Sequence, residues 1–125
     1  MKLEYLPDGA DACPFVRIYE FGSAEARRMH DVFTSLASGS LERVSLEEIM
    51  PVDSIDGCHI TFTRGAKDRG VIKTGDHRFD VVLSSLGWSQ TAGLAEPFRD
   101  NCSRGYEWLT DAGDIQLLFS PSGDW

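Results

Sequence analysis

A basic turn is the most distinctive chemical feature of the sequence. Residues 64–70 read Arg-Gly-Ala-Lys-Asp-Arg-Gly, and Lys73 follows shortly after. Glycines that flank a basic turn let backbone amides approach an anion while the side chains neutralise its charge. The segment is not a phosphate-binding P-loop, because the Gly-Lys-Ser/Thr end is absent and a strand is expected to follow. We therefore expect Arg64, Lys67, Arg69 and Lys73 to bind an anion or a partner, the alternative being a solvated hairpin tip.

Two histidines and a carboxylate form a second candidate site. If residues 58–64 and 70–74 pair as a hairpin, His59 comes to lie near Asp76 and His77. Two imidazoles and a carboxylate are metal ligands of the kind used in water activation or oxygen chemistry. Because their spacing matches no common ligand motif, the alternative is an ordinary polar surface.

Two possible nucleophiles lack the partners that catalysis requires. Residues 87–91 resemble half of a nucleophile elbow, but Thr91 replaces the second glycine and all three histidines precede Ser89. Ser89 is better interpreted as a helix N-cap. Cys58 adjoins His59, yet neighbouring strand residues point to opposite faces and cannot form a nucleophile and base. An enzyme is therefore the less favoured interpretation, and no cofactor is expected.

The three cysteines, Cys13, Cys58 and Cys102, are widely spaced. Their odd number and the lack of a Cys-x-x-Cys pair argue against a disulfide framework and against zinc. We expect each of them to be a small buried hydrophobe.

Length, composition and charge narrow the class of protein. The chain has 125 residues, 42% hydrophobic and 26% charged, which predicts one compact globular domain over residues 1–125. Twelve Lys and Arg against twenty Asp and Glu give a net charge of -8, which disfavours general nucleic-acid binding. No apolar run approaches the roughly 18 residues of a membrane span, and the N-terminus has no signal-type apolar core. These features predict a cytoplasmic protein without membrane contact.

Hydrophobic periodicity predicts two helices among many strands. One helix is expected from Ser23 to near Gly39, and a second between Ser89 and Glu96, where Pro97 stops it. Strands are predicted over residues 2–6, 15–21, 58–64, 70–74, 78–84, 105–110 and 114–120. Residues 41–49 fit either a strand, favoured for 42–46, or a strand that leads into a helical turn before Pro51. Short turns between strands favour hairpins. The predicted class is α+β, a mainly antiparallel sheet built from hairpins with two helices packed on one face.

Two hairpin registers predict which side chains enter the core. Pairing residues 58–64 with 70–74 places Ile60, Phe62 and Ile72 on one buried face. In the last hairpin, pairing Thr110 with Ile115 yields a core stripe of Tyr106, Trp108, Leu117 and Phe119.

Two classes of function fit these observations. The first is a non-catalytic protein-interaction or self-associating module, in which the basic turn gives a self-complementary charge pattern for a dimer. The alternative is a small enzyme or a ligand- or anion-binding protein, with its site at residues 64–78 near His59 and His77. The first is favoured because no complete catalytic set can be assembled from the residues.

Overall fold

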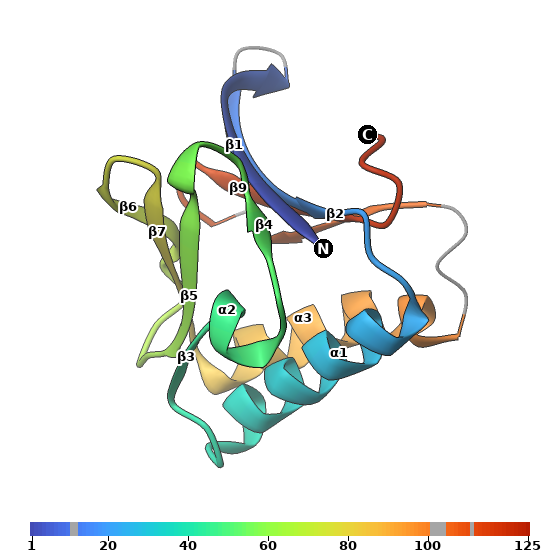
Figure 1. Ribbon diagram of the computed structural model, residues 1–125. Coiled ribbons are helices and arrows are strands. Elements are labelled where there is room, and N and C mark those ends of the chain that lie inside the picture. The colour runs from blue at the N-terminus through green and yellow to red at the C-terminus, as the bar shows by residue number, and fades with distance from the viewer. Residues whose placement is uncertain (11–12, 101–104, 111) are drawn as a thin grey trace.

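The computed structural model describes residues 1–10, 13–100, 105–110 and 112–125. Its strands form two sheets that pack against one layer of two helices (Figure 1). The predicted α+β class is confirmed. The prediction of a single, mainly antiparallel sheet is wrong in detail, because there are two sheets and each contains both parallel and antiparallel strand pairs.

The five-stranded sheet has the order β4-β1-β2-β9-β8. Its strands are β1 (Lys2–Ala10), β2 (Cys13–Tyr19), β4 (Asp53–Ser54), β8 (Glu107–Thr110) and β9 (Gln116–Ser120). Strand β2 pairs with β1 on one side and with β9 on the other. Its apolar residues on both faces fit this central place, which the sequence predicted.

The four-stranded sheet has the order β3-β5-β7-β6. Its strands are β3 (Arg43–Ser45), β5 (His59–Arg64), β6 (Gly70–Gly75) and β7 (Arg78–Leu83). The predicted hairpin of β5 with β6 is wrong, because β7 lies between them, parallel to β5 and antiparallel to β6. The loop from β5 to β6 crosses the end of β7, where Gly65 N–H donates to the Leu83 carbonyl and Arg69 N–H to the Val82 carbonyl. Val71, rather than Ile72, therefore enters the core from β6.

Two long helices, α1 (Ser23–Ser38) and α3 (Ser85–Ala95), form the second layer. Helix α1 confirms the first prediction and ends at Gly39, whose φ of 86° needs a glycine. Helix α3 begins a turn earlier than predicted, because the Ser84 hydroxyl accepts a hydrogen bond from Gly87 N–H at 3.2 Å. Ser84, not Ser89, is thus the N-cap.

Shorter elements complete the fold: α2 (Leu46–Ile49) and the 3₁₀ turns η1 (Ile55–Gly57) and η2 (Glu96–Arg99), which contains Pro97. Residues 42–46, favoured as a strand, divide between β3 and α2, which is the alternative of a strand that leads into a helical turn before Pro51. Among the described residues, no helix is long and apolar enough to cross a membrane.

A single hydrophobic cluster joins both sheets to both long helices. Trp88 of α3 is fully buried at its centre, with its ring 5.6 Å from that of Phe33 and 5.8 Å from that of Phe62. The Trp88 indole N–H also donates to the Thr63 carbonyl at 3.0 Å, so its one polar atom is satisfied. Trp88 thus fixes α3 against both α1 and β5.

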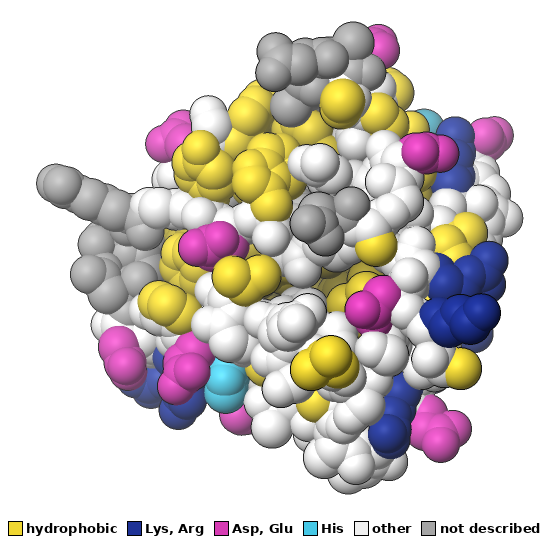
Figure 2. Space-filling model, turned by 180° about the vertical axis from the view of Figure 1, so that it is seen from behind, with side chains coloured by type: hydrophobic (Ala, Val, Ile, Leu, Met, Phe, Trp, Pro, Cys, Tyr) yellow, Lys and Arg dark blue, Asp and Glu magenta, His cyan; other side chains and the backbone are white. Residues whose placement is uncertain are grey.

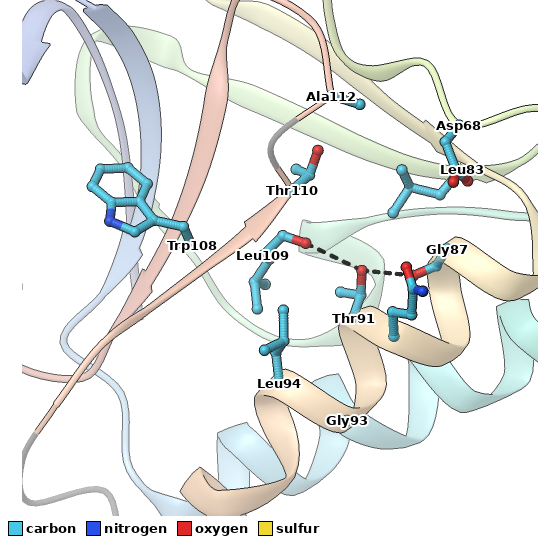
Figure 3. Close-up of a pocket in the computed structure, with 11 residues that line it drawn as sticks. Asp68, Leu83, Gly87, Thr91, Gly93, Leu94, Trp108, Leu109, Thr110 and Ala112 are labelled. Carbon is cyan, nitrogen blue, oxygen red and sulfur yellow. Dashed lines mark hydrogen bonds between the residues drawn. The ribbon is translucent and has the colours of Figure 1, made fainter.

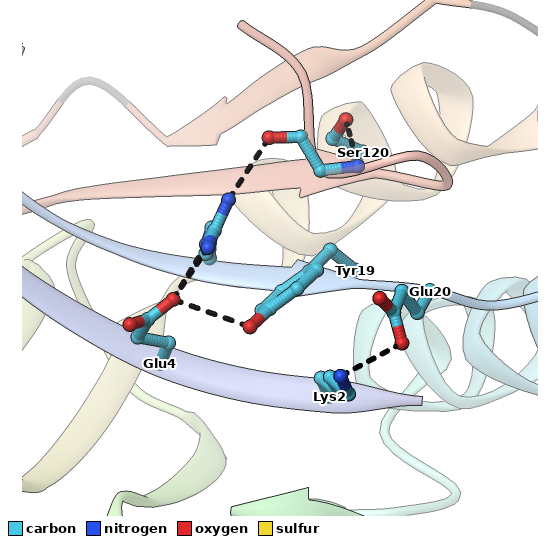
Figure 4. Close-up of polar contacts among 7 residues, drawn as sticks. Lys2, Glu4, Tyr19, Glu20 and Ser120 are labelled. Atoms are coloured by element: carbon cyan, nitrogen blue, oxygen red, sulfur yellow. Dashed lines mark hydrogen bonds and ion pairs between the residues drawn. The ribbon is translucent and has the colours of Figure 1, made fainter. Parts of the chain in front are cut away.

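The C-terminal segment covers part of the outer face of the five-stranded sheet, over Phe15 and Arg17. The Arg17 guanidinium binds the Glu4 carboxylate at 2.6 Å and donates to the Gly123 carbonyl at 3.0 Å (Figure 4). Trp108 pairs with Leu118 and lies on this same face, with its ring 5.2 Å from that of Phe15. The predicted core stripe is therefore wrong at Trp108 and also at Tyr106, which is 43% exposed, because Thr110 pairs with Leu117 rather than with Ile115 and the register shifts between Trp108 and Thr110.

Candidate functional site

A groove of about 570 Å³ lies between α3 and β8 (Figure 3). Its lining is Asp68, Leu83, Gly87, Gln90, Thr91, Gly93, Leu94, Trp108, Leu109, Thr110 and Ala112. The Trp108 ring points away from the groove, as Figure 3 shows, and lies on the other side of β8. The groove is thus bounded by α3, by the edge strand β8 and by the basic turn that carries Asp68.

Two glycines of α3 shape the wall of the groove. A Cβ at Gly87 would overlap the Asp68 carboxylate, so internal packing requires a glycine there. A Cβ at Gly93 would meet nothing within 4 Å. Glycine inside a helix is less stable than alanine by about 1 kcal/mol. No contact in the described part of the chain explains why position 93 lacks a side chain.

Two threonines form the floor. The Thr91 hydroxyl lies 2.9 Å from the Gly87 carbonyl and 3.3 Å from the Leu109 carbonyl, to which it can donate. Thr110 is only 7% exposed, and its hydroxyl has no hydrogen-bond partner among the described residues. An unpaired buried hydroxyl is unfavourable by about 1–3 kcal/mol. The floor of the groove therefore holds one unsatisfied polar atom, which solvent does not reach.

Asp68 attaches the basic turn to the start of α3. Its Oδ1 accepts hydrogen bonds from the Ser84 backbone N–H at 2.8 Å and from the Ser84 hydroxyl at 2.7 Å. These hydrogen bonds lower the pKa of the Asp68 carboxyl. Asp68 and its neighbours Lys67 and Arg69 are all exposed at this rim, and the Asp68 carboxylate is fixed by Ser84.

The four predicted basic residues do not gather at one point. Lys67 and Arg69 share the rim, but the Arg64 guanidinium lies against Gly39 at the C-terminal end of α1. Lys73 on β6 lies over the Tyr5 ring, 5.4 Å from its centre. Anion or partner binding by the full set stays a prediction, and the structure places only two of its members beside the groove.

The histidines are placed differently from the predicted metal site. His59 pairs with Arg78 across the strands, and its Nδ1 lies 2.7 Å from a Glu47 carboxylate oxygen. The turn between β6 and β7 holds Asp76 and His77. The His59 backbone N–H donates to the His77 backbone carbonyl at 2.7 Å, so this contact does not involve the imidazoles. In the part of the chain that the structure describes, no group of three or more His, Cys, Asp or Glu side chains is arranged to hold a metal. The metal site stays a prediction that this arrangement does not favour.

The basic turn and His59 also lie at opposite ends of β5. A strand of six residues separates its ends by roughly 17 Å. The fold therefore does not bring residues 65–69 together with His59 and His77 in one site. The reason is the topology: the turn joins β5 to β6 at one end of the sheet, and Asp76 and His77 join β6 to β7 at the other.

The described cysteines differ from each other. Cys58 is buried as predicted, and its burial, followed by the nearby Glu4 charge, raises the pKa of its thiol to about 12. Cys13 is exposed, so the prediction of burial is wrong there. Cys102 lies outside the described residues.

Helix α3 presents an uncharged surface, which was not recognised in the sequence. All of its exposed residues are apolar or neutral; they are Leu86, Ser89, Gln90, Gly93 and Leu94, hereafter the α3 face. Leu86 is 67% exposed and Leu94 is 36% exposed. Helix α1, by contrast, exposes Arg27, Arg28 and Asp31. Figure 2, which views the molecule from behind, shows a mainly uncharged area in its lower part with charged side chains around it.

Comparison with known proteins gives no relative. No family model matches the chain, and neither a curated protein nor a solved structure matches it. The α3 face and the groove beside it are thus the features from which a function can be inferred.

Proposed function

We propose that this protein is a non-catalytic interaction module that binds a protein partner through the α3 face and the adjoining groove. The observation that carries the proposal is the absence of charge from the exposed side of α3. The surface helix of a soluble protein ordinarily turns charged and polar residues to water, as α1 does. The centre of a protein–protein interface is, in contrast, depleted in charged residues.

The exposed leucines indicate a surface wider than the groove. Leu94 lines the groove, but Leu86 does not, although it is the most exposed large hydrophobic residue in the described part of the chain. A small molecule within the groove would leave Leu86 in water. A protein partner covers both residues, so the distribution of apolar side chains favours a macromolecular partner.

Gly93 and Thr110 support the same interpretation. A glycine without close neighbours in the middle of a helix lets another backbone approach closely. The Thr110 hydroxyl lacks a partner in the described chain and is shielded from solvent, so a polar group of a bound protein would reach it only if the floor of the groove opens. Both features lower the stability of the free molecule.

The lining of the groove favours binding over catalysis. Asp68 is its one titratable side chain among the described residues, and Ser84 occupies Oδ1 of that carboxylate. His59 and His77 lie at the far end of the four-stranded sheet. General acid–base or nucleophilic chemistry requires two or three such groups within hydrogen-bond reach of one another.

The proposal is tested by charged substitutions within the α3 face. Tagged full-length chain is purified from cells that produce the protein, together with Leu94→Glu and the control Arg28→Glu on the exposed side of α1. We expect a co-purified protein, identified by mass spectrometry, with the natural chain and with Arg28→Glu but not with Leu94→Glu. The same pattern must recur with the two purified proteins. Binding that survives Leu94→Glu and a matching Leu86→Glu overturns the proposal.

A further inference from the structure

We propose that the partner of the α3 face is a second copy of this chain, with the two α3 helices packed antiparallel around a two-fold axis near Gln90. The inference rests on the proposed function and specifies the partner. An isologous contact uses the same patch on both molecules, so the patch must complement itself. The α3 face meets this requirement in its apolar residues and in its flanking charges.

The apolar residues are placed symmetrically about Gln90. Leu86, Gln90 and Leu94 are four residues apart and follow one ridge of the helix. Gln90 is the midpoint of this series. An antiparallel second helix centred on Gln90 sets Leu86 against the partner's Leu94 and Leu94 against the partner's Leu86. Both exposed leucines are then covered, and Gly93 lets the two backbones approach.

The charges at the two ends of α3 are complementary under the same symmetry. Lys67 and Arg69 are exposed beside its N-terminal end, and Glu96 and Asp100 are exposed just beyond its C-terminal end. Asp68 offsets one of the positive charges. Arg99 and Arg27, whose Nε donates to the Arg99 carbonyl at 3.1 Å, stand beside the acidic pair. The exposed Glu96 and Asp100 carboxylates are the groups that would meet the partner's Lys67 and Arg69. Antiparallel packing brings the basic end of each copy to the acidic end of the other.

The length of α3 sets the strength of this association. Eleven residues span about 16 Å, so the contact belongs to the small interfaces that hold weak or transient complexes. The net charge of -8 on each copy opposes association in general. Because charges are screened beyond about 8 Å at physiological salt, the local complementarity at the ends of α3 outweighs this repulsion.

Analytical ultracentrifugation of the full chain tests the inference at concentrations from about 1 µM to about 1 mM. We expect a reversible monomer–dimer equilibrium. Leu86→Glu places two new charges in the contact and should weaken dimerisation at least tenfold, roughly the effect of 1.4 kcal/mol. The control Arg28→Glu adds a negative charge on α1 and should leave the equilibrium unchanged. A chain that stays monomeric throughout, or a dimer insensitive to Leu86→Glu, overturns the inference.

A charge-exchange experiment tests the antiparallel arrangement. Lys67→Glu with Arg69→Glu sets acidic side chains against the partner's Glu96 and Asp100, and Glu96→Lys with Asp100→Lys sets basic side chains against the partner's Lys67 and Arg69. Each double variant alone should dimerise at least tenfold more weakly than the natural chain, and an equimolar mixture should recover a heterodimer. Circular dichroism confirms that each variant is folded. A mixture no more dimeric than its components contradicts the arrangement.

The two proposals fail in distinguishable ways. If ultracentrifugation shows only monomer while the purification experiment identifies another protein whose binding depends on Leu94, the proposed function stands and the second copy is excluded. If neither experiment shows association that depends on the α3 face, both proposals are wrong.

Discussion

The Asp68 carboxylate accepts two hydrogen bonds from Ser84, one from its backbone N–H at 2.8 Å and one from its hydroxyl at 2.7 Å. Ser84 is also the N-cap of α3, since its hydroxyl accepts from Gly87 N–H. This pair therefore links the position of the basic turn to the start of the helix that forms the proposed binding surface. Lys67 and Arg69 stand at a defined place beside α3 because Asp68 between them is fixed.

The Asp68–Ser84 pair predicts a pH dependence of stability. The pKa of Asp68 is lowered in the folded state, so its contribution to stability is present above the ordinary aspartate pKa of 3.8 and is lost as pH falls through the folded pKa. We expect Asp68→Asn to be less stable than the natural chain near pH 7 and the difference to shrink below about pH 3.8. Urea unfolding at several pH values measures this. A difference in unfolding free energy that is constant with pH would mean that the Asp68 charge does not contribute to stability.

The two groove glycines predict opposite effects of the same substitution. Gly93→Ala should stabilise the protein by about 0.5–1 kcal/mol, because its Cβ meets nothing and alanine favours the helix. Gly87→Ala should destabilise it by about 1–3 kcal/mol, because the new Cβ overlaps the Asp68 carboxylate. Thermal and urea unfolding of the pair check the prediction. Stabilisation by both substitutions would contradict the packing of Asp68 on α3.

Because the Thr110 hydroxyl has no hydrogen-bond partner among the described residues, its removal should not destabilise the protein. Thr110→Val keeps the shape of the side chain and removes a buried polar atom without a partner in the described chain. We expect unfolding free energy to be unchanged or to rise by up to about 1 kcal/mol. The neighbouring change Thr91→Val serves as the contrast and should destabilise, because the Thr91 hydroxyl donates a hydrogen bond. A loss for Thr110→Val as large as that for Thr91→Val would show that the Thr110 hydroxyl is paired.

The two described cysteines predict selective thiol labelling. Burial raises the pKa of the Cys58 thiol to about 12, whereas Cys13 is exposed. Because the thiolate is the reactive form, iodoacetamide at pH 8 should modify Cys13 in the folded protein while Cys58 reacts only after unfolding. Peptide mass mapping separates the two sites. Equal labelling of Cys58 under native conditions would contradict its burial.

Local signals in the sequence predicted the elements well. The spacing of Ala26, Met29, Phe33 and Leu36 predicts helix α1, and each of these side chains is buried. The apolar residues on both faces of β2 likewise indicated a strand inside a sheet. These patterns depend on neighbouring residues only, so tertiary contacts did not alter them.

Strand pairing depended on contacts that no local pattern contains. A five-residue loop after Arg64 suggested a hairpin, yet β7 inserts between β5 and β6, and the loop is held by the Leu83 and Val82 carbonyls. The metal prediction failed to gain support for the same reason, since it depended on that register. The α3 face was not predicted because none of its residues carries a charged or titratable side chain. Its signal in the sequence was the lack of charge over residues 85–95.

Site-specific photo-crosslinking tests the central claim, that the α3 face binds a protein, most directly. A benzophenone amino acid replaces Gly93 in the full chain, and in a control it replaces Arg28 on the exposed side of α1, in cells that produce the protein. After irradiation we expect a covalent adduct with one protein from position 93 and none from position 28. An adduct twice the mass of the chain identifies the second copy. No adduct from position 93, or the same adducts from both positions, would contradict the assignment of α3 as the binding surface.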